Sequence, residues 1–246
     1  MPGNFLTPLT VSVIIPVYNE VTNIARVIGE IKALPPDPAY TLEILVVDGG
    51  SKDGTVEAAR SAGARVLPQK ERGYGAACYT GFEASTTEIV VFLDGDYSDP
   101  PASLPALLAP LVDNRADLVL GTRIGSLTGS GAGRDALPAQ AVWGNRLVTG
   151  LIRLLYGYKL SDLPSFKAIR RKKLAAFGMQ EMTYGWTTEM LVKAVRSKYR
   201  VVEVPVAYRP RGGGKSKVSG TVRGTLKAAY FLLRTTFRYT RWQPLA

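Results

Sequence analysis

The chain has 246 residues, of which 46% are hydrophobic and 21% are charged, a composition typical of a globular protein that buries a sizeable core. Its 31 lysines and arginines exceed its 20 acidic residues and give a net charge of +11, which suits nucleic acid, an anionic membrane surface or a phosphate-rich substrate. The sequence contains no histidine and a single cysteine, Cys78. Ser–His and Cys–His mechanisms, imidazole metal ligands and an intrachain disulfide are therefore excluded, and a reduced cytosolic setting is favoured.

The beginning of the chain, MPGNFLTPLT, lacks the charged and apolar regions of a signal peptide. No uninterrupted apolar run reaches the roughly 20 residues that a membrane-spanning helix needs. We therefore expect a protein that is soluble or bound peripherally to a membrane.

Short runs rich in β-branched residues alternate with stretches of helical periodicity in the first half of the chain. Strands are expected at 11–16, 42–48, 65–67, 89–93 and 117–121, with helices between them at 24–34, 53–61, 74–84 and 103–112. Cys78 falls on the third of these helices, where a small core residue is expected. This alternation predicts a single α/β domain with a mostly parallel central sheet flanked by helices.

The composition changes after Arg123. Residues 124–138 are rich in Gly, Ser and Ala and predict a loop over the strand ends. A helix is expected at 142–158, a strand at 165–170, a helix at 186–197 and a strand at 201–208. The first of these helices carries apolar residues along one side, namely Leu147, Leu151, Leu154 and Leu155. The basic glycine-rich segment RPRGGGKSKVSG follows the last strand.

Residues 221–242 predict a C-terminal amphipathic helix, so the expected organisation is a domain over 1–220 and a basic helix within 221–246. One face carries Val222, Leu226, Ala229, Tyr230, Leu233 and Phe237, and the adjacent face carries Arg223, Lys227, Arg234, Arg238 and Arg241. This pattern is typical of a helix that lies on an anionic membrane surface. The alternative is that the apolar face packs on the domain or on a second subunit.

The expected strand at 89–93 ends in Asp94-Gly95-Asp96. Ligands of α/β proteins bind beyond the carboxyl ends of parallel strands. Two carboxylates at such a position can hold a divalent cation that takes its remaining ligands from water and substrate phosphates. The alternative for a lone Asp-Gly is a hairpin turn.

Five motifs follow one another in a characteristic order: VSVIIPVYNE, VVDGGSKDGT, RGYGAACYTGFE, VFLDGDYSD and LVLGTR. In this order the sequence resembles the family-2 glycosyltransferases, which transfer sugars from nucleotide diphosphates and have the GT-A fold. The later segments SDLPSFKAIRR, TYGWTTEM and EVPVAYRPRGGGKSKVSGT are similar to the branch of polyprenyl-phosphate mannose and glucose synthases. The resemblance covers roughly residues 10–220.

The resemblance implies a donor site with Mg²⁺ or Mn²⁺ held by Asp94 and Asp96. It places the nucleotide-sugar beside Gly95 and beside the residues Pro16, Tyr18, Glu20 and Asp48. Gly73 and Gly75 are expected to let the backbone approach the nucleotide and to begin a helix, and a dinucleotide-binding motif is disfavoured because the third glycine is missing. Many relatives have a second acid after Asp48, where this chain has Gly49, so the identity of the nucleotide stays open.

On the acceptor side, Arg123 matches the arginine that the family places near the acceptor phosphate. Arg211, Lys215, Ser216 and Lys217 match its mobile basic loop, and Arg134 and Arg146 lie near further phosphate ligands. Asp162 and Glu189 are the carboxylates available in this region. Asp162 is interpreted as an organiser of the acceptor site, a general base or a structural residue, and Glu189 as a base for a hydroxyl acceptor.

We therefore expect an inverting, metal-dependent enzyme that moves a hexose from a donor of the GDP-mannose or UDP-glucose type to a polyprenyl phosphate. Arg123, Asp94, Asp96, Asp162 and Glu189 are its candidate catalytic residues. The alternatives are transfer to a lipid or small-molecule hydroxyl, a non-catalytic scaffold, and a nucleic-acid-binding protein, although no nucleic-acid motif is recognisable. The expected location is the cytoplasmic face of the membrane, and a homodimer or a membrane partner protein is left open.

Overall fold

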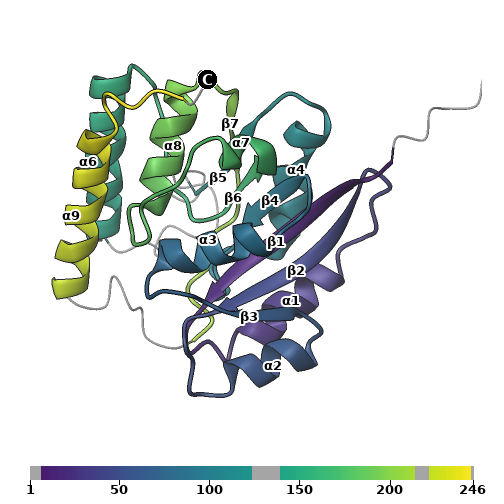
Figure 1. Cartoon of the computed structure of the whole chain (residues 1–246). Helices are drawn as coiled ribbons and strands as arrows, with labels where there is room; N and C mark the ends of the chain where they lie inside the picture. Colours follow the sequence, from purple (N-terminus) through teal and green to yellow (C-terminus); the bar gives the residue numbers. More distant parts are fainter. Residues whose placement is uncertain (1–6, 124–138, 214–221, 245–246) are drawn as a thin grey trace, which may run out of the picture.

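The computed structural model describes residues 7–123, 139–213 and 222–244, and the side chains of 142–213 and 228–244 in the last two ranges. Seven strands in this part form one sheet with the order β3-β2-β1-β4-β6-β5-β7 (Figure 1). They are β1 (Leu9–Val17), β2 (Tyr40–Asp48), β3 (Arg65–Pro68), β4 (Ile89–Phe92), β5 (Leu118–Thr122), β6 (Lys167–Arg170) and β7 (Val201–Pro205). Each expected strand is present, with ends that differ by up to three residues.

Helices cover both faces of the sheet. They are α1 (Ile24–Lys32), α2 (Thr55–Ser61), α3 (Tyr74–Ala84), α4 (Leu104–Val112), α6 (Ala139–Tyr156), α7 (Arg171–Ala175), α8 (Trp186–Arg196) and α9 (Val222–Arg238). A short 3₁₀ turn, Pro101–Ser103, precedes α4. The expected α/β class with a mostly parallel sheet is confirmed, and the short helix α7 is an addition that the sequence pattern did not predict.

The order of the strands reverses at β1, which places a crevice beside it. β1 pairs in parallel with β2 on one side and with β4 on the other, so that Val13 lies between Ile44 and Val91. The chain runs outward from β1 through β2 to β3 and then returns to β4. At such a switch point the loops after neighbouring strands diverge and leave room for a ligand at their carboxyl ends.

β6 runs antiparallel to both of its neighbours, β4 and β5. Its sequence, KAIR, is too short to reveal its direction. The reversal has a consequence for the site, because the residues that precede β6 lie at the same edge of the sheet as the residues that follow β4 and β5.

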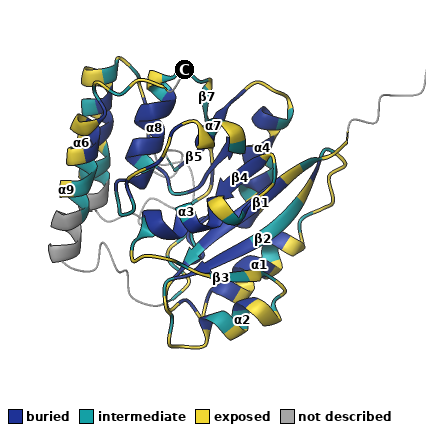
Figure 2. Cartoon of the chain, in the orientation of Figure 1, coloured by how far each residue is buried: buried dark blue, intermediate teal, exposed yellow. Residues whose placement is uncertain are grey.

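Alternating residues of β1 contribute to two cores. Val13 and Ile15 pack with apolar residues of α1 and α4 on one face, while Ile14 packs with residues of α3 and α8 on the other. Cys78 is fully buried in the second core, as predicted. Because both faces are covered, the central strands are buried along most of their length (Figure 2).

The helices α6 and α9 lie side by side at one edge of the molecule, and both contact α8 (Figure 1). α6 buries Val148 and Ile152, whereas Leu147 and Leu154 of the predicted apolar side are 55% and 78% exposed. Much of the apolar side that the sequence pattern marked therefore faces outward. No helix in the described part is long and apolar enough to cross a bilayer.

α9 packs on the domain through a face that the sequence pattern did not select. Thr235 and Thr236 are fully buried, whereas Tyr230 and Phe237 of the predicted apolar face are 61% and 52% exposed. Arg238, expected among the lipid-facing basic residues, instead forms an ion pair of 2.9 Å with Glu181. The helix is thus held against α6 and α8, and the proposed division of the chain at residue 220 stays a prediction.

Candidate active site

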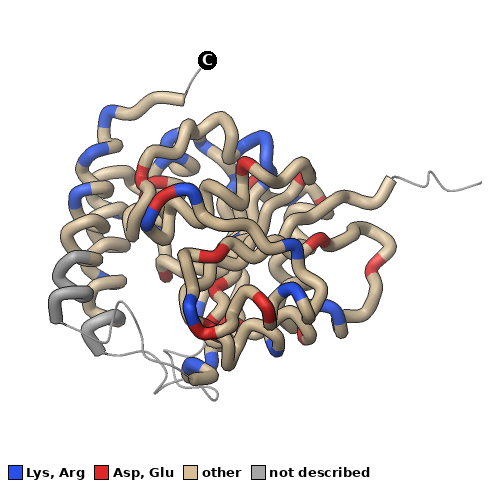
Figure 3. Tube along the Cα trace, turned by 60° about the horizontal axis from the view of Figure 1, so that its bottom comes forward, with Lys and Arg blue, Asp and Glu red and all other residues tan. Residues whose placement is uncertain are grey.

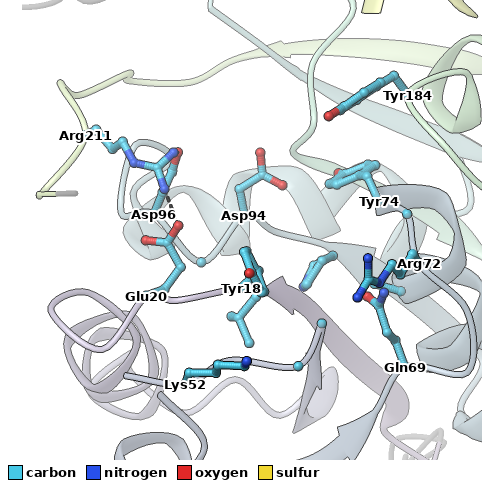
Figure 4. Close-up of a pocket in the computed structure, with 17 residues that line it drawn as sticks. Tyr18, Glu20, Lys52, Gln69, Arg72, Tyr74, Asp94, Asp96, Tyr184 and Arg211 are labelled. Carbon is cyan, nitrogen blue, oxygen red and sulfur yellow. Dashed lines mark hydrogen bonds and ion pairs between the residues drawn. The ribbon is translucent and has the colours of Figure 1, made fainter. Parts of the chain in front are cut away.

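A cavity of about 810 Å³ opens at the carboxyl ends of β1, β2 and β4, beside the start of α3 (Figure 4). Most of the predicted donor-site residues line it, namely Pro16, Tyr18, Glu20, Gly73, Asp94 and Gly95. Sequence reasoning missed further polar lining residues, which are Lys52, Gln69, Arg72 and Tyr184. The cavity therefore combines carboxylates with cationic side chains, as a site for a charged ligand would.

Asp94 and Asp96 reach the cavity from the loop after β4. Burial raises the pKa of Asp94 to about 6, and the negative charge of Asp96 adds to this effect. Asp96 is held by Ser98, whose backbone N–H and hydroxyl both donate to Oδ1, at 3.0 and 2.6 Å. A buried carboxylate beside a second carboxylate favours a bound cation, which would compensate the negative charge.

These two carboxylates fit a divalent metal ion that is completed by its substrate. Among the residues that the structure describes, no group of three or more His, Cys, Asp or Glu side chains could hold a metal ion. Mg²⁺ and related hard cations commonly use one or two carboxylates and take further oxygen ligands from phosphates and water. Asp94 and Asp96 would hold the ion, and a diphosphate would supply the missing ligands.

Arg211 occupies the same cavity and bridges two acidic residues. Its Nη1 lies 2.8 Å from Oδ2 of Asp96, and its Nη2 forms an ion pair with Glu20. The Gly212 N–H donates to the Asp96 carbonyl at 3.1 Å, which fixes the loop there. The sequence assigned Arg211 to the acceptor phosphate, whereas the structure pairs it with Glu20 and Asp96, two residues predicted for the donor site (Figure 4).

Gly75 serves the packing of the chain rather than the approach of a ligand. Its N–H donates to the Thr183 carbonyl at 3.2 Å, and a Cβ there would lie 2.3 Å from the Glu181 carbonyl oxygen. A Cβ at Gly73, which lines the cavity with φ +142°, would meet the Met182 carbonyl oxygen at 2.1 Å. The two glycines therefore let α3 begin against residues 181–183, as expected. Gly73 also lines the cavity, where its role at the nucleotide stays a prediction, whereas Gly75 does not line it.

Asp48 organises the turn after β2 and is not a lining residue of the cavity. Its carboxylate accepts the N–H groups of Gly50, at 2.9 Å, and of Ser51. The neighbouring Gly49 does line the cavity, and a Cβ there would come within 3.2 Å of Gln69 Oε1 and the Val17 carbonyl oxygen. Asp48 thus holds in place the turn that contributes Gly49 and Gly50 to the cavity wall.

Arg123 and Asp162 form a buried ion pair at the end of β5. The guanidinium donates from Nε and Nη2 to the two carboxylate oxygens, at 2.8 and 2.7 Å, and the Arg123 N–H donates at 3.0 Å. Asn145 of α6 and the Leu163 N–H complete the set of donors. Burial disfavours the charged form of Asp162, but the hydrogen bonds and charge of Arg123 outweigh it and lower its pKa.

This geometry fits Asp162 as an organiser of Arg123 and does not fit it as a base. A base needs a free lone pair and a pKa near the working pH. Asp162 is fully buried, and each of its oxygens already accepts at least two hydrogen bonds. The pair connects residues 39 positions apart and brings α6 to the site.

Glu189 is a residue of α8 that points into the protein interior and does not line the cavity. Its carboxylate is fully buried, accepts the N–H groups of Gln180 and Glu181, and pairs with Lys193 at 2.6 Å. Lys193 also donates to the carbonyls of Phe177 and Gly178. The carboxylate holds the 177–181 segment in place, so this position corrects the interpretation of Glu189 as a base.

Two buried ionisable residues beside the site were not singled out from the sequence. Asp99 is 1% exposed, and burial followed by the charge of Asp94 raises its pKa to about 7. Its Oδ2 accepts the Ser165 hydroxyl at 3.1 Å, while Oδ1 has no partner among the described residues. Lys167 is fully buried, and burial lowers its pKa to about 8 although Asp94 and Asp99 oppose this. The signal for Lys167 was a lysine inside the apolar strand SFKAIR.

One further predicted residue, Arg146, does not line the cavity. Arg146 is exposed on α6, with its guanidinium 5.9 Å from the ring centre of Trp143. Arg134, Lys215, Ser216 and Lys217 lie outside the described residues.

Comparison with known proteins gives the class of this α/β protein. Residues 12–177 match the model of glycosyl transferase family 2. The chain is 36% identical over 222 residues to an uncharacterized glycosyltransferase of Mycobacterium tuberculosis, which covers 89% of this chain and 94% of that relative. It is also 33% identical over 203 residues to a dolichyl-phosphate hexose transferase of Haloferax volcanii, with coverages of 82% and 84%.

A further relative is an undecaprenyl-phosphate mannosyltransferase of Micrococcus luteus, 30% identical over 232 residues and covering 88% of this chain and 90% of the relative. Among solved structures, glucosyl-3-phosphoglycerate synthase of Mycobacterium tuberculosis in complex with Mn²⁺, UDP and phosphoglyceric acid superposes with a TM-score of 0.76 at 24% identity. That match covers 97% of this chain and 80% of the other.

The chain belongs to glycosyl transferase family 2. It is a glycosyltransferase with the GT-A type of α/β fold, as the motifs predicted. Its similarity to the dolichyl- and undecaprenyl-phosphate sugar transferases confirms the resemblance to that branch.

Proposed function

We propose that this glycosyltransferase moves a hexose from a nucleotide-diphospho-sugar to a polyprenyl phosphate, with inversion at the anomeric carbon and with Mg²⁺ or Mn²⁺ as cofactor. The observation that carries the proposal is the pair Asp94 and Asp96 in a cavity of about 810 Å³ that also contains Lys52, Arg72 and Arg211. Carboxylates beside several cationic side chains suit a metal–diphosphate group better than a neutral ligand.

The donor side must stabilise a leaving group. Breaking the bond between the anomeric carbon and the diphosphate leaves negative charge on the phosphate oxygens, and a divalent ion bound there acts as a Lewis acid. Arg72 and Lys52 lie on the cavity wall, where they can bind phosphate oxygens. Arg211 must leave Asp96 before a cation binds there, and its guanidinium can then bind the diphosphate from the same side.

The acceptor side favours a phosphate over a hydroxyl. A phosphate monoester is anionic at neutral pH and attacks without a general base, whereas a hydroxyl needs one. Asp162 and Glu189, the two candidate bases, are both fully buried and saturated with hydrogen bonds. Arg123, oriented by Asp162, is the residue we propose to bind the acceptor phosphate, because guanidinium groups pair with such anions in a bidentate manner.

Transfer to a hydroxyl is the second candidate function, and Asp99 is the observation that favours it. A carboxylate whose pKa is raised to about 7 and that has an unpartnered oxygen is suited to accept a proton. Asp99 is buried and is not a lining residue of the cavity, so it would need a rearrangement to reach an acceptor. Because the chain belongs to a glycosyltransferase family, the alternative of a non-catalytic scaffold is dropped. The alternative of nucleic-acid binding is not supported by any recognisable motif.

An acceptor embedded in a bilayer implies an enzyme that works at the membrane surface, and we place it on the cytoplasmic side, where nucleotide-sugars are made. The donor and the lipid phosphate are the proposed partners. Homodimerisation and a membrane partner protein stay predictions.

The test is a transfer assay with purified protein, radiolabelled GDP-mannose or UDP-glucose, and a water-soluble short-chain prenyl phosphate or the corresponding prenol. We expect product from the phosphate, dependence on Mg²⁺ or Mn²⁺, and loss of transfer in Asp94→Ala. Asp113→Ala is the matched control, because Asp113 is an exposed surface carboxylate. Full activity of Asp94→Ala would exclude the metal role, and product from the prenol with loss of activity in Asp99→Asn would favour the second candidate.

A further inference from the structure

The exposed apolar side chains of this protein are concentrated on two neighbouring helices. Of the eight large hydrophobic residues that are exposed in the described part, six lie on α6 and α9, and these are Trp143, Leu147, Leu154, Leu155, Tyr230 and Phe237. Trp143 and Leu154 are 71% and 78% exposed. Scattered single residues of this kind are ordinary on a protein surface, but a cluster marks an interaction site.

The cluster on α6 forms a stripe along the helix. Trp143, Leu147 and Leu154 follow at intervals of four and seven residues and therefore share one face, opposite the buried Val148 and Ile152. Arg146 and Arg153, seven residues apart and exposed, border this stripe. The outer face of α6 is thus an apolar ridge with guanidinium groups at its side.

α9 continues the same chemistry. Tyr230, Arg234 and Phe237 are exposed and follow at intervals of four and three residues, which places them on one face of α9. The exposed Arg241 lies in the turn just after the helix. The opposite face packs on the domain through Thr235 and Thr236, and the Tyr156 hydroxyl of α6 donates to the Thr236 carbonyl at 2.5 Å. The contact holds the two helices together, so that their outer faces belong to one edge of the molecule (Figure 2).

The positive charge of this edge indicates that its partner is anionic. The sequences of α6 and α9 contain six arginines and lysines and no aspartate or glutamate, and Figure 3 shows basic positions along the described part of α9. Within the described residues, Arg153 and Arg234 form no ion pair. An apolar ridge interleaved with unpaired cations and aromatic rings matches a lipid headgroup region that carries negative charge.

We propose that the outer faces of α6 and α9 form one surface that binds an anionic lipid bilayer. The surface is defined by Trp143, Leu147, Leu154, Tyr230 and Phe237 with Arg146, Arg153 and Arg234. A second copy of the chain is a poorer occupant, because a two-fold contact would bring two faces of the same positive sign together. Nucleic acid is a poorer occupant because it offers no apolar phase for the exposed ridge. The inference deepens the proposed function and rests on it for the lipid nature of the acceptor.

α6 also connects this surface to the site. Asn145, between Trp143 and Leu147 in sequence, donates to Asp162 at 2.8 Å, and Asp162 orients Arg123. The helix that would lie on the bilayer therefore also carries Asn145, which donates a hydrogen bond to the ion pair of the proposed acceptor site. Binding at the surface would bring that pair close to a phosphate at headgroup level.

The experiment is flotation of the full chain with vesicles of phosphatidylcholine alone or with phosphatidylglycerol, in the absence of donor and acceptor. We expect binding to the anionic vesicles that weakens with salt. Trp143→Ser with Leu154→Ser, and separately Arg153→Gln with Arg234→Gln, should each reduce the partition coefficient by about tenfold or more. Val21→Ser and Arg60→Gln are matched controls, since both are exposed residues elsewhere on the protein and should bind as the wild type does.

Three outcomes would overturn the inference. They are no flotation of the wild type, flotation that the surface variants leave unchanged, and a concentration-dependent dimer that dissociates in Trp143→Ser, which would assign the surface to a second copy. The transfer assay with a water-soluble acceptor separates this test from the proposed function. Surface variants should keep that activity, whereas a wild type that floats but glycosylates no prenyl phosphate would leave the surface standing and refute the acceptor.

Discussion

The substitution Asp162→Asn tests the ion pair on which the proposed acceptor site depends. The Asp162 side chain is fully buried, and that of Arg123 is 15% exposed. The carboxylate accepts from three donors of Arg123, from Asn145 and from the Leu163 N–H. Asparagine has nearly the same shape, but one of its oxygens is replaced by an NH₂ group that faces donors, and Arg123 loses its counter-charge.

Removing one partner of a buried ion pair costs about 3–5 kcal/mol, so we expect the free energy of unfolding to fall by that amount near neutral pH, measured by denaturant titration. The pKa of Asp162 is lowered in the folded protein, so the pair contributes stability above the ordinary carboxyl pKa. That contribution is lost as the pH falls below about 4 and through the lowered pKa. The difference between variant and wild type should shrink in acid.

In kinetics, the variant should raise the KM for the prenyl phosphate and leave the KM for the donor near its wild-type value, because Asp162 does not line the donor cavity. Asp113→Asn is the matched control, since its pair with Arg115 is 52% and 62% exposed and should be worth less than about 1 kcal/mol. An unfolding midpoint equal to that of the wild type would refute the expected loss of stability. A fall in kcat with an unchanged KM for the acceptor would refute the positioning role and assign Asp162 to catalysis.

Gly75→Ala places a Cβ 2.3 Å from the Glu181 carbonyl oxygen and should lower the free energy of unfolding by about 1–3 kcal/mol. The control Gly144→Ala, whose Cβ would have nothing within 4 Å, should not destabilise the protein. Equal unfolding midpoints of the two variants would contradict this. Arg211→Ala frees both carboxylates that it bridges, so calorimetry should show tighter binding of Mn²⁺ alone, and weaker binding would count against competition at this position. Asp99→Asn should stabilise the protein by at most about 4 kcal/mol at pH 8. Because the raised pKa of Asp99 favours its protonated form in the folded state, this gain should vanish below about pH 4, and a gain independent of pH would refute the cause.

The sequence by itself determined the elements and the centre of the donor site. Most strands are short runs rich in apolar and β-branched residues, and most helices have their own apolar periodicity, so local patterns place them. The short helix α7 is the exception. Asp94 and Asp96 could be predicted because they directly follow the apolar strand 89–93, and the carboxyl end of a strand in an α/β sheet is where ligands bind. Pro16 lies at the end of β1, and Tyr18 and Glu20 directly follow it. All three line the same cavity, because they too lie at the carboxyl end of a strand.

Only the tertiary structure decided which residues meet across the fold and which faces are covered. Arg123 and Asp162 are 39 positions apart, and Arg211 lies 115 positions from Asp96, separations over which no local pattern carries information. Nothing in a strand of four residues indicates that β6 is antiparallel. The outward side of α6 could not be predicted, because an apolar stripe shows that a helix is amphipathic, whereas its neighbours decide which stripe they cover. The same physical reason left Leu147 and Leu154 exposed at the edge that we propose to meet the bilayer.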